Sequence, residues 1–211
     1  PVTQPAGLAR SQYEDLVALI LSVNGQAPGA TRLSAGDVRP SRAPDLPAPD
    51  TEWLHHRGDA GSMNYSPLAQ INRGNAKNLQ PVWNLSLDNS ANASTQPIIV
   101  NGVMYVASHN STTAIDAVTG RQKWKTPVEL PADINGFLCC GIHTRGLAAM
   151  DGLIYRTTLD AHVVALNAAD GKEVWRSKAA DYKLGYSMTA APLVVNGVVM
   201  TGMSGGEYGT R

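Results

Sequence analysis

The two cysteines of the chain, Cys139 and Cys140, are adjacent, and the sequence contains no other cysteine. A trans peptide holds neighbouring Cα atoms about 3.8 Å apart, whereas disulfides prefer roughly 4.4–6.8 Å between these atoms. A disulfide here would therefore close a small ring and force its peptide bond away from planarity. The alternative is two small buried side chains in contact, since free cysteine is often buried. This stretch alone favours the buried pair, and its redox chemistry stays open.

Composition argues against several classes of partner. The 17 basic and 17 acidic residues balance over 211 residues, so we expect no nucleic-acid partner and no basic membrane-binding surface. The longest apolar run, Leu16 to Leu21, is too short to span a bilayer. Because the chain begins with Pro1 and stops soon after a strand-like run, we expect an internal fragment of a longer protein.

The first 50 residues predict a helix followed by a linker. Within residues 1–24, Ser11 and Glu14 have the spacing of a capping box, and apolar residues then recur at helical spacing. Such a helix cannot bury its apolar stripe alone, so we expect its partners upstream. Residues 25–50 are rich in Pro, Ala, Gly and Arg without a period, which predicts a semi-extended linker and a domain boundary.

From Trp53 onward the sequence predicts repeated short β-strands. Residues 97–108, 147–158 and 191–202 each contain an apolar run, an Asn-Gly or Asp-Gly turn and a second apolar run. These dipeptides between strands are a strong hairpin signal, because both turn residues need a positive φ. The three segments therefore predict three equivalent hairpins.

A second repeat alternates with the hairpins and ends in tryptophan. The stretches AIDAVTGRQKW (114–124) and ALNAADGKEVW (165–175) align position for position, and Trp83 occupies a similar place one unit earlier. A period of about 40–50 residues with about four short strands is typical of propeller blades. A β-sandwich with coincidental turns is the alternative, and the repeated stretch argues against it. We therefore predict a mainly β fold of about three blades, with the tryptophans packed between neighbouring blades.

The alternation of hairpins and tryptophan repeats resembles the pyrroloquinoline quinone (PQQ) dehydrogenases, which are eight-bladed β-propellers that oxidise alcohols. Three further stretches are similar to the same family. They are the lead-in segment 53–83, the adjacent-cysteine stretch CCGIHTRG at 139–146, and residues 185–211 with their Thr-x-Ala-Pro and Ser-Gly-Gly-Glu motifs. The resemblance covers Trp53 to Arg211 and implies that residues 51–211 are the N-terminal blades of such a propeller.

Residues 1–24 and the tail that follows resemble the last helix of a class I c-type cytochrome. The haem attachment motif, Cys-x-x-Cys-His, does not occur in the chain and would lie upstream. The combined resemblance therefore implies a partial eight-bladed propeller that one α-helix of a truncated cytochrome c-like domain precedes. The linker at 25–50 would join the two.

The resemblance also implies roles for individual residues. Cys139 and Cys140 would form a vicinal disulfide against one face of PQQ, and Arg145 would pair with a PQQ carboxylate, which suits a planar guanidinium. Glu207 would be a ligand of Ca²⁺ or a lanthanide ion, since hard cations prefer carboxylate oxygens. The other cofactor-binding residues would be two hydroxyl donors and two glycines that let the backbone approach closely, Thr189, Ser204, Gly205 and Gly206.

The chain departs from the family pattern at three positions. Ser94 stands where the family often has a glutamate that touches PQQ, so a contact between Ser94 and PQQ stays open. Thr144 replaces the asparagine that usually precedes the motif arginine, and His143 replaces an apolar residue. We assign no chemistry to His143.

The implied whole protein is a periplasmic bacterial alcohol dehydrogenase that depends on PQQ and a metal. It would oxidise a primary or related alcohol to the aldehyde, and electrons would pass to haem c and then to a cytochrome c or quinone chain. The catalytic aspartate would lie beyond Arg211, so we expect no catalytic residue in this chain and no activity from it alone. Two alternatives stay open: a non-catalytic β-propeller scaffold, such as an outer-membrane assembly factor, and a polyvinyl-alcohol-type quinohaemoprotein dehydrogenase.

Overall fold

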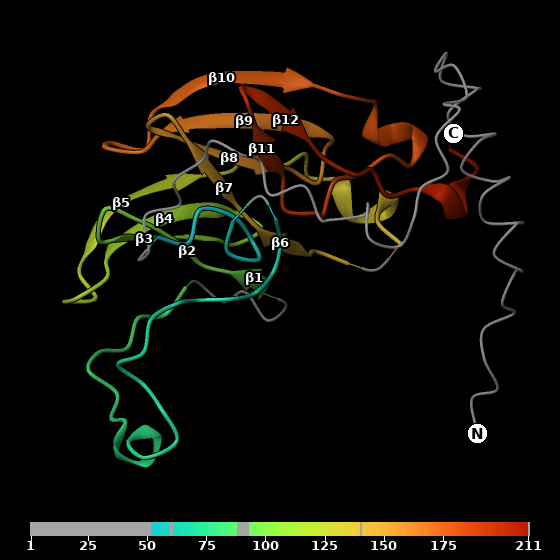
Figure 1. Cartoon of the computed structure of the whole chain (residues 1–211). Coiled ribbons are helices and arrows are strands. Elements are labelled where there is room, and N and C mark those ends of the chain that lie inside the picture. Colours follow the sequence, from blue (N-terminus) through green and yellow to red (C-terminus); the bar gives the residue numbers. More distant parts are fainter. Residues whose placement is uncertain (1–51, 60, 88–92, 140, 211) are drawn as a thin grey trace, which may run out of the picture. The chain divides into compact units, whose positions relative to one another are not determined.

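The computed structural model describes residues 52–59, 61–87, 93–139 and 141–210 (Figure 1). The helix predicted within residues 1–24 and the linker at 25–50 lie outside the described residues, as does Cys140. Within the described ranges the fold is mainly β, and its helical elements are short 3-10 turns. No helix in these ranges has the length and apolarity needed to cross a membrane.

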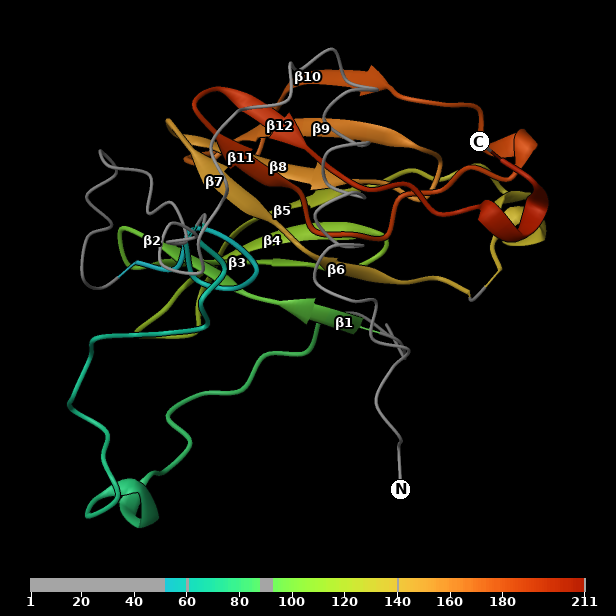
Figure 2. The same ribbon diagram turned by 45° about the vertical axis from the view of Figure 1, so that its right-hand side comes forward.

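Two four-stranded antiparallel sheets repeat one plan (Figures 1 and 2). Strands that follow one another in the sequence are neighbours in each sheet, as the repeated hairpins predict. The first sheet contains β2 (Ile98–Val100), β3 (Val103–Ala107), β4 (Ser111–Asp116) and β5 (Gln122–Pro127). The second contains β7 (Ala148–Met150), β8 (Leu153–Thr157), β9 (His162–Asn167) and β10 (Glu173–Lys178). A third repeat is represented by the hairpin of β11 (Leu193–Val195) and β12 (Val198–Met200).

The three predicted hairpin turns are confirmed. The first turn residue is Asn101, Asp151 or Asn196, each with a φ of 50°. The glycine that follows has a φ of 72°, 74° or 75°. Two consecutive positive φ angles match the twist of the flanking strands, which explains the Asn-Gly and Asp-Gly dipeptides.

Tryptophans pack against the next repeat at two of the three predicted places. The indole Nε1 of Trp83 donates to Ala117 O at 3.1 Å, and its ring lies against Gly120. Trp124 occupies the same place against Gly171, where an added Cβ would lie 2.5 Å from the ring atom Cε3. Each ring therefore fills the space that a side chain on the next repeat's glycine would need.

Trp175 differs from the other two tryptophans. Its side chain is 37% exposed, and its ring contact is Tyr155 of its own sheet, with 6.0 Å between the centroids. By contrast, Trp124 Nε1 donates to Ala168 O of the second sheet at 3.0 Å, and Tyr105 Oη donates to the same oxygen at 3.1 Å. Among the described residues, the predicted packing between blades is thus made by Trp83 and Trp124 but not by Trp175.

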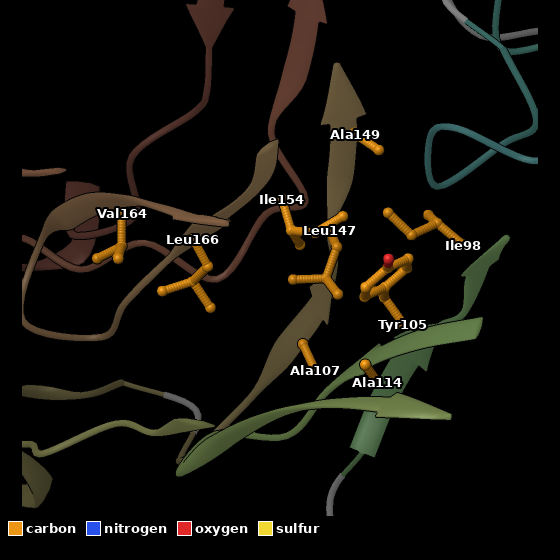
Figure 3. Packing of buried hydrophobic residues seen from close by; sticks show 9 residues of the cluster. All are labelled: Ile98, Tyr105, Ala107, Ala114, Leu147, Ala149, Ile154, Val164 and Leu166. Carbon is orange, nitrogen blue, oxygen red and sulfur yellow. The ribbon is translucent and has the colours of Figure 1, made fainter. Parts of the chain in front are cut away.

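The main hydrophobic core lies between the first and second sheets (Figure 3). Both sheets contribute small and branched apolar side chains, so each sheet supplies the surface that the other needs to bury. The buried members of the cluster are Ile98, Tyr105, Ala107, Ala114, Leu147, Ala149, Ile154, Val164 and Leu166.

One cation is buried at the same interface. Arg156 of β8 is 2% exposed and reaches the first sheet, where Nη1 donates to Thr112 Oγ1 at 2.8 Å and Nη2 donates to Ser108 O at 3.0 Å. Burial lowers the pKa of Arg156 to about 10. The guanidinium therefore stays charged at neutral pH and joins the two sheets through two neutral acceptors.

Residues 53–55, which we call the strap, contact the first strand of each of the three repeats that the structure describes. Trp53 exchanges two backbone hydrogen bonds with Ile99, of 2.8 and 2.9 Å. Leu54 O accepts one from Ala149 N–H at 2.9 Å. The ring Nε2 of the third strap residue, His55, lies 2.9 Å from Val194 O. These three partners are the middle residues of β2, β7 and β11, so consecutive strap residues meet equivalent places in consecutive repeats.

Candidate functional site

Arg145 and Thr189 are brought together by the segments that lead into the second and third repeats. Arg145 lies on β6 (Thr144–Gly146), directly before β7, and Thr189 lies shortly before β11. The backbone N–H of Arg145 donates to Thr189 O at 3.0 Å. Its guanidinium Nη1 also donates to Thr189 Oγ1 at 2.5 Å. The backbone contact sets the register of the two segments, and the side-chain contact joins two predicted cofactor-binding residues.

The lead-in segment of the first repeat lies beside that of the second. Strand β1 (Ala93–Gln96) pairs in parallel with β6, so that Ala93 faces Thr144 and Gln96 faces Gly146. Ser94 is thereby placed on the strand next to Arg145. Ser94, Thr144 and Thr189 each stand four residues before the first residue of a first strand, so a hydroxyl occupies this place in all three repeats.

The Ser-Gly-Gly-Glu stretch is held against the segment that leads to Thr189. Ser204 and Ser187 exchange two backbone hydrogen bonds, of 2.8 and 3.1 Å. Gly205 has a φ of 128°, and a Cβ at this position would overlap Gly185 O. A side chain is excluded by both the backbone conformation and the contact, which agrees with a predicted role in close backbone approach.

Cys139 and Glu207 meet at one end of the described fold. Cys139 follows the turn η2 (Ile134–Phe137), and Glu207 lies on the turn η4 (Gly206–Tyr208), which is beside η2 in both views (Figures 1 and 2). A hydrogen bond from the Cys139 thiol, followed by one from its own backbone N–H, lowers the pKa of Glu207 below its usual value. The exposed carboxylate is therefore ionised at neutral pH.

A third turn completes this end of the fold. The turn η3 (Tyr182–Leu184) packs on η2, where the rings of Tyr182 and Phe137 meet edge to face with centroids 5.4 Å apart. Tyr182 Oη also donates to Asp133 Oδ1 at 3.0 Å. The three turns are thus in contact with one another: η2 before Arg145, η3 before Thr189 and η4 after Ser204.

The predicted site residues fall into two groups of direct contacts. Arg145 and Thr189 form one group, and Cys139 and Glu207 form the other. Ser204 and Gly205 link the groups through residues 185–187, and Gly206 begins the turn that carries Glu207. Cys140 lies outside the described residues, so its pairing stays a prediction. Within the described part of the chain, no cluster of three or more His, Cys, Asp or Glu side chains is arranged for a metal ion.

Two residues with defined roles had no signal in the sequence. His55 is 6% exposed and lies on the strap, although the sequence shows only an isolated histidine pair. Burial lowers the pKa of His55, and its contact with Val194 O opposes this shift only in part. Thr157 Oγ1 donates to Ala190 O at 2.7 Å, next to Thr189. A threonine in a strand is ordinary, so no pattern could have predicted this contact.

Comparison with known proteins agrees with this architecture. The quinoprotein alcohol dehydrogenase PedH of Pseudomonas putida is 45% identical over 150 residues, which is 70% of this chain and 25% of the relative. The 1-butanol dehydrogenase (cytochrome c) of Thauera butanivorans is 39% identical over 162 residues, 76% of this chain and 23% of the relative. The structure of a europium-containing methanol dehydrogenase matches with a TM-score of 0.73 and 36% identity, covering 77% of this chain and 29% of that one.

The chain spans about a quarter of the length of these curated relatives, 25% and 23%. Residues 53–209 match the family model described as the glucose/ethanol/alcohol dehydrogenase β-propeller domain, which is named for PQQ. This match begins at the strap and ends just after η4, so it contains both groups of site residues. The chain therefore belongs to the PQQ-dependent alcohol dehydrogenase β-propeller family.

Proposed function

We propose that the whole protein is a PQQ- and metal-dependent alcohol dehydrogenase and that this chain forms one side of its cofactor pocket. The observation that carries the proposal is a pair of contacts between segments of different repeats, Arg145 with Thr189 and Cys139 with Glu207. PQQ, when bound, supplies a quinone that accepts two electrons from the alcohol. The chain's own residues bind and orient that group, and none of them is assigned as the catalytic base.

Arg145 and Thr189 fit a planar acid such as PQQ. Arg145 is exposed and has no carboxylate within ion-pair distance among the described residues, so its charge is available to an anionic ligand. The Thr189 hydroxyl accepts from the guanidinium and can still donate its own proton to the ligand. Gly205 lies against Gly185 O, where a side chain could not fit.

Glu207 fits a hard cation, with Cys139 as its neighbour. The carboxylate is exposed and ionised, and one of its oxygens accepts from the Cys139 thiol. A disulfide between Cys139 and Cys140 would leave no thiol proton to donate, so Glu207 would lose this donor. The carboxylate would then keep the hydrogen bond from its own backbone N–H, and its other lone pairs would be open to Ca²⁺ or a lanthanide ion. Further ligands come from residues beyond this chain.

The remaining parts of the proposal rest on the resemblance of the sequence. Residues 1–24 would end a cytochrome c-like domain whose haem c takes electrons from the propeller. The eight-bladed closure, the periplasmic location and a small primary alcohol as the substrate follow from the same resemblance. The acceptor named for the Thauera relative, cytochrome c, supports the proposed direction of electron flow.

The test of this proposal compares two glutamine variants in the whole protein. Glu207→Gln keeps the volume and removes the charge that binds a hard cation, so we expect alcohol oxidation to fall by about tenfold or more at low metal concentration. Raising Ca²⁺ or a lanthanide should restore part of the activity. Glu173→Gln is the control, because Glu173 pairs with Arg176 on the outer strand β10, 2.9 Å apart. Superimposable activity curves against metal for Glu207→Gln and the unchanged protein would refute a ligand role.

A further inference from the structure

Strand β8 has side chains that reach two different repeats. Arg156 points to the first sheet and bonds Thr112 and Ser108. The next residue, Thr157, donates from Oγ1 to Ala190 O, in the segment before β11, at 2.7 Å. Successive side chains of a strand lie on opposite faces, which explains why neighbouring residues reach opposite repeats. Both side chains are 2% exposed.

The segment around Thr189 is therefore held from two sides. Thr189 O accepts from the backbone N–H of Arg145 at 3.0 Å, and the next carbonyl, that of Ala190, accepts from Thr157. Two consecutive carbonyls with fixed donors leave the backbone of this segment little freedom to rotate. The Thr189 hydroxyl, which contacts the Arg145 guanidinium, is attached directly to this backbone.

The hydroxyl of Thr157 is not a general requirement of the repeat. Thr157 is the last residue of β8, and its equivalent in the first sheet, the last residue of β3, is Ala107. Ala107 is fully buried in the same core and has no hydroxyl. A four-stranded repeat can therefore fold without a hydroxyl donor at the last residue of its second strand. The donor occurs in the repeat that neighbours Thr189.

We propose that Thr157 is a positioning residue for the cofactor pocket, an inference that rests on the proposed function. By fixing Ala190 O, it holds Thr189 in the orientation in which its hydroxyl and the Arg145 guanidinium bind the same anionic ligand together. Thr157 itself touches neither ligand nor substrate. Its loss lets the segment 189–191 rotate, which weakens the binding of PQQ more than it weakens the fold.

The test measures the affinity of the whole apo-protein for PQQ at saturating metal. Thr157→Val keeps the size and branching and removes the donor, so we expect PQQ binding to weaken about fivefold, the effect of one neutral hydrogen bond. Thr157→Ser keeps the hydroxyl and should bind within about twofold of the unchanged protein. If Thr157→Val folds poorly, Thr157→Ala, which copies Ala107, serves in its place.

Thr126→Val is the matched control, because Thr126 Oγ1 donates to Gly171 O at 2.6 Å between the first and second sheets. Both valine variants should lower the melting temperature, and only Thr157→Val should weaken PQQ binding. Equal weakening in both variants, or unchanged binding in Thr157→Val, overturns the inference. Arg145→Gln separates this from the proposed function. If both Thr157→Val and Arg145→Gln bind PQQ normally, the proposed function fails together with the positioning role of Thr157.

Discussion

The first and second sheets have the same strand order but different surroundings. Trp124, which belongs to the first sheet, lies on Gly171 of the second repeat and donates to Ala168 O. At the outer strand of the second sheet, every residue of β10 is exposed, and Trp175 pairs with Tyr155 of its own sheet, as Trp124 pairs with Tyr105. Among the described residues, the next repeat therefore packs on Trp83 and Trp124 and leaves Trp175 partly exposed.

The largest effect should come from filling the space that Trp124 occupies. In Gly171→Ala the new Cβ would lie 2.5 Å from the indole ring, and the position has a φ of 73°. We expect a loss of about 4 kcal/mol in the free energy of unfolding, from overpacking and left-handed strain together. Gly152→Ala, with a φ of 74° and no atom within 4 Å, has the strain alone. It should cost about 1 kcal/mol. Chemical denaturation measures both, and equal losses would contradict the packing argument.

Truncating the two tryptophans should give the next largest difference. We expect Trp124→Ala to cost about 3 kcal/mol, because the ring is packed between two sheets. Trp175→Ala should cost about 1 kcal/mol in the 211-residue chain, where its ring is 37% exposed. In a longer protein where a further repeat covers Trp175, the two losses should become similar. Denaturant midpoints of both variants in the short and long chains decide whether the next repeat buries the ring.

Removing one hydroxyl from equivalent tyrosines should give a smaller difference in stability between the two sheets. Tyr105 Oη donates to Ala168 O of the second sheet at 3.1 Å, and burial raises the pKa of Tyr105, which keeps this hydroxyl protonated. Tyr105→Phe should cost about 1 kcal/mol, since the part-buried Ala168 carbonyl loses one of its two donors. Tyr155 holds the equivalent place in the second sheet, and Tyr155→Phe should change stability by less than about 0.5 kcal/mol. Thermal unfolding of the two variants is the measurement, and equal shifts would refute the difference.

The smallest effect should be a pH dependence at the third repeat, where the strap uses a ring instead of a backbone group. Burial lowers the pKa of His55 below 6.5, so on acidification the unfolded chain binds this proton before the folded protein does. The contribution of the neutral His55 to stability is therefore fully present above about pH 7 and falls as the pH drops through 6.5. Asp59 is the nearby charge that opposes the shift. His55→Gln should flatten this slope, and His56→Gln should not. The same slope in His55→Gln would assign it to another group.

Much of the fold could be predicted because its turns are local. Asn101-Gly102 and its two counterparts need positive φ angles, which few residues adopt, so the dipeptides predict the hairpins wherever they occur. The glycines of the tryptophan repeat, Gly120 and Gly171, are predicted in the same way by their spacing from the tryptophan. The motif residues of the site could also be named, because the stretches 139–146 and 185–211 resemble those of a known family.

The contacts between these residues could not be predicted, because they depend on how the repeats pack. Arg145 meets Thr189, and Cys139 meets Glu207, only because the lead-in segments and turns of different repeats lie side by side. The bond from Thr157 to Ala190 depends on which face of β8 meets the third repeat.

The sequence by itself determined which residue types stand in each repeat, through turn chemistry and period. Only the tertiary structure decided which of them touch. A hydrogen bond requires its two atoms to lie within about 3.5 Å of each other, and sheet packing sets that distance for residues far apart in the chain. The strap shows this best: three consecutive residues meet three repeats, and nothing in Trp53, Leu54 or His55 alone indicates it.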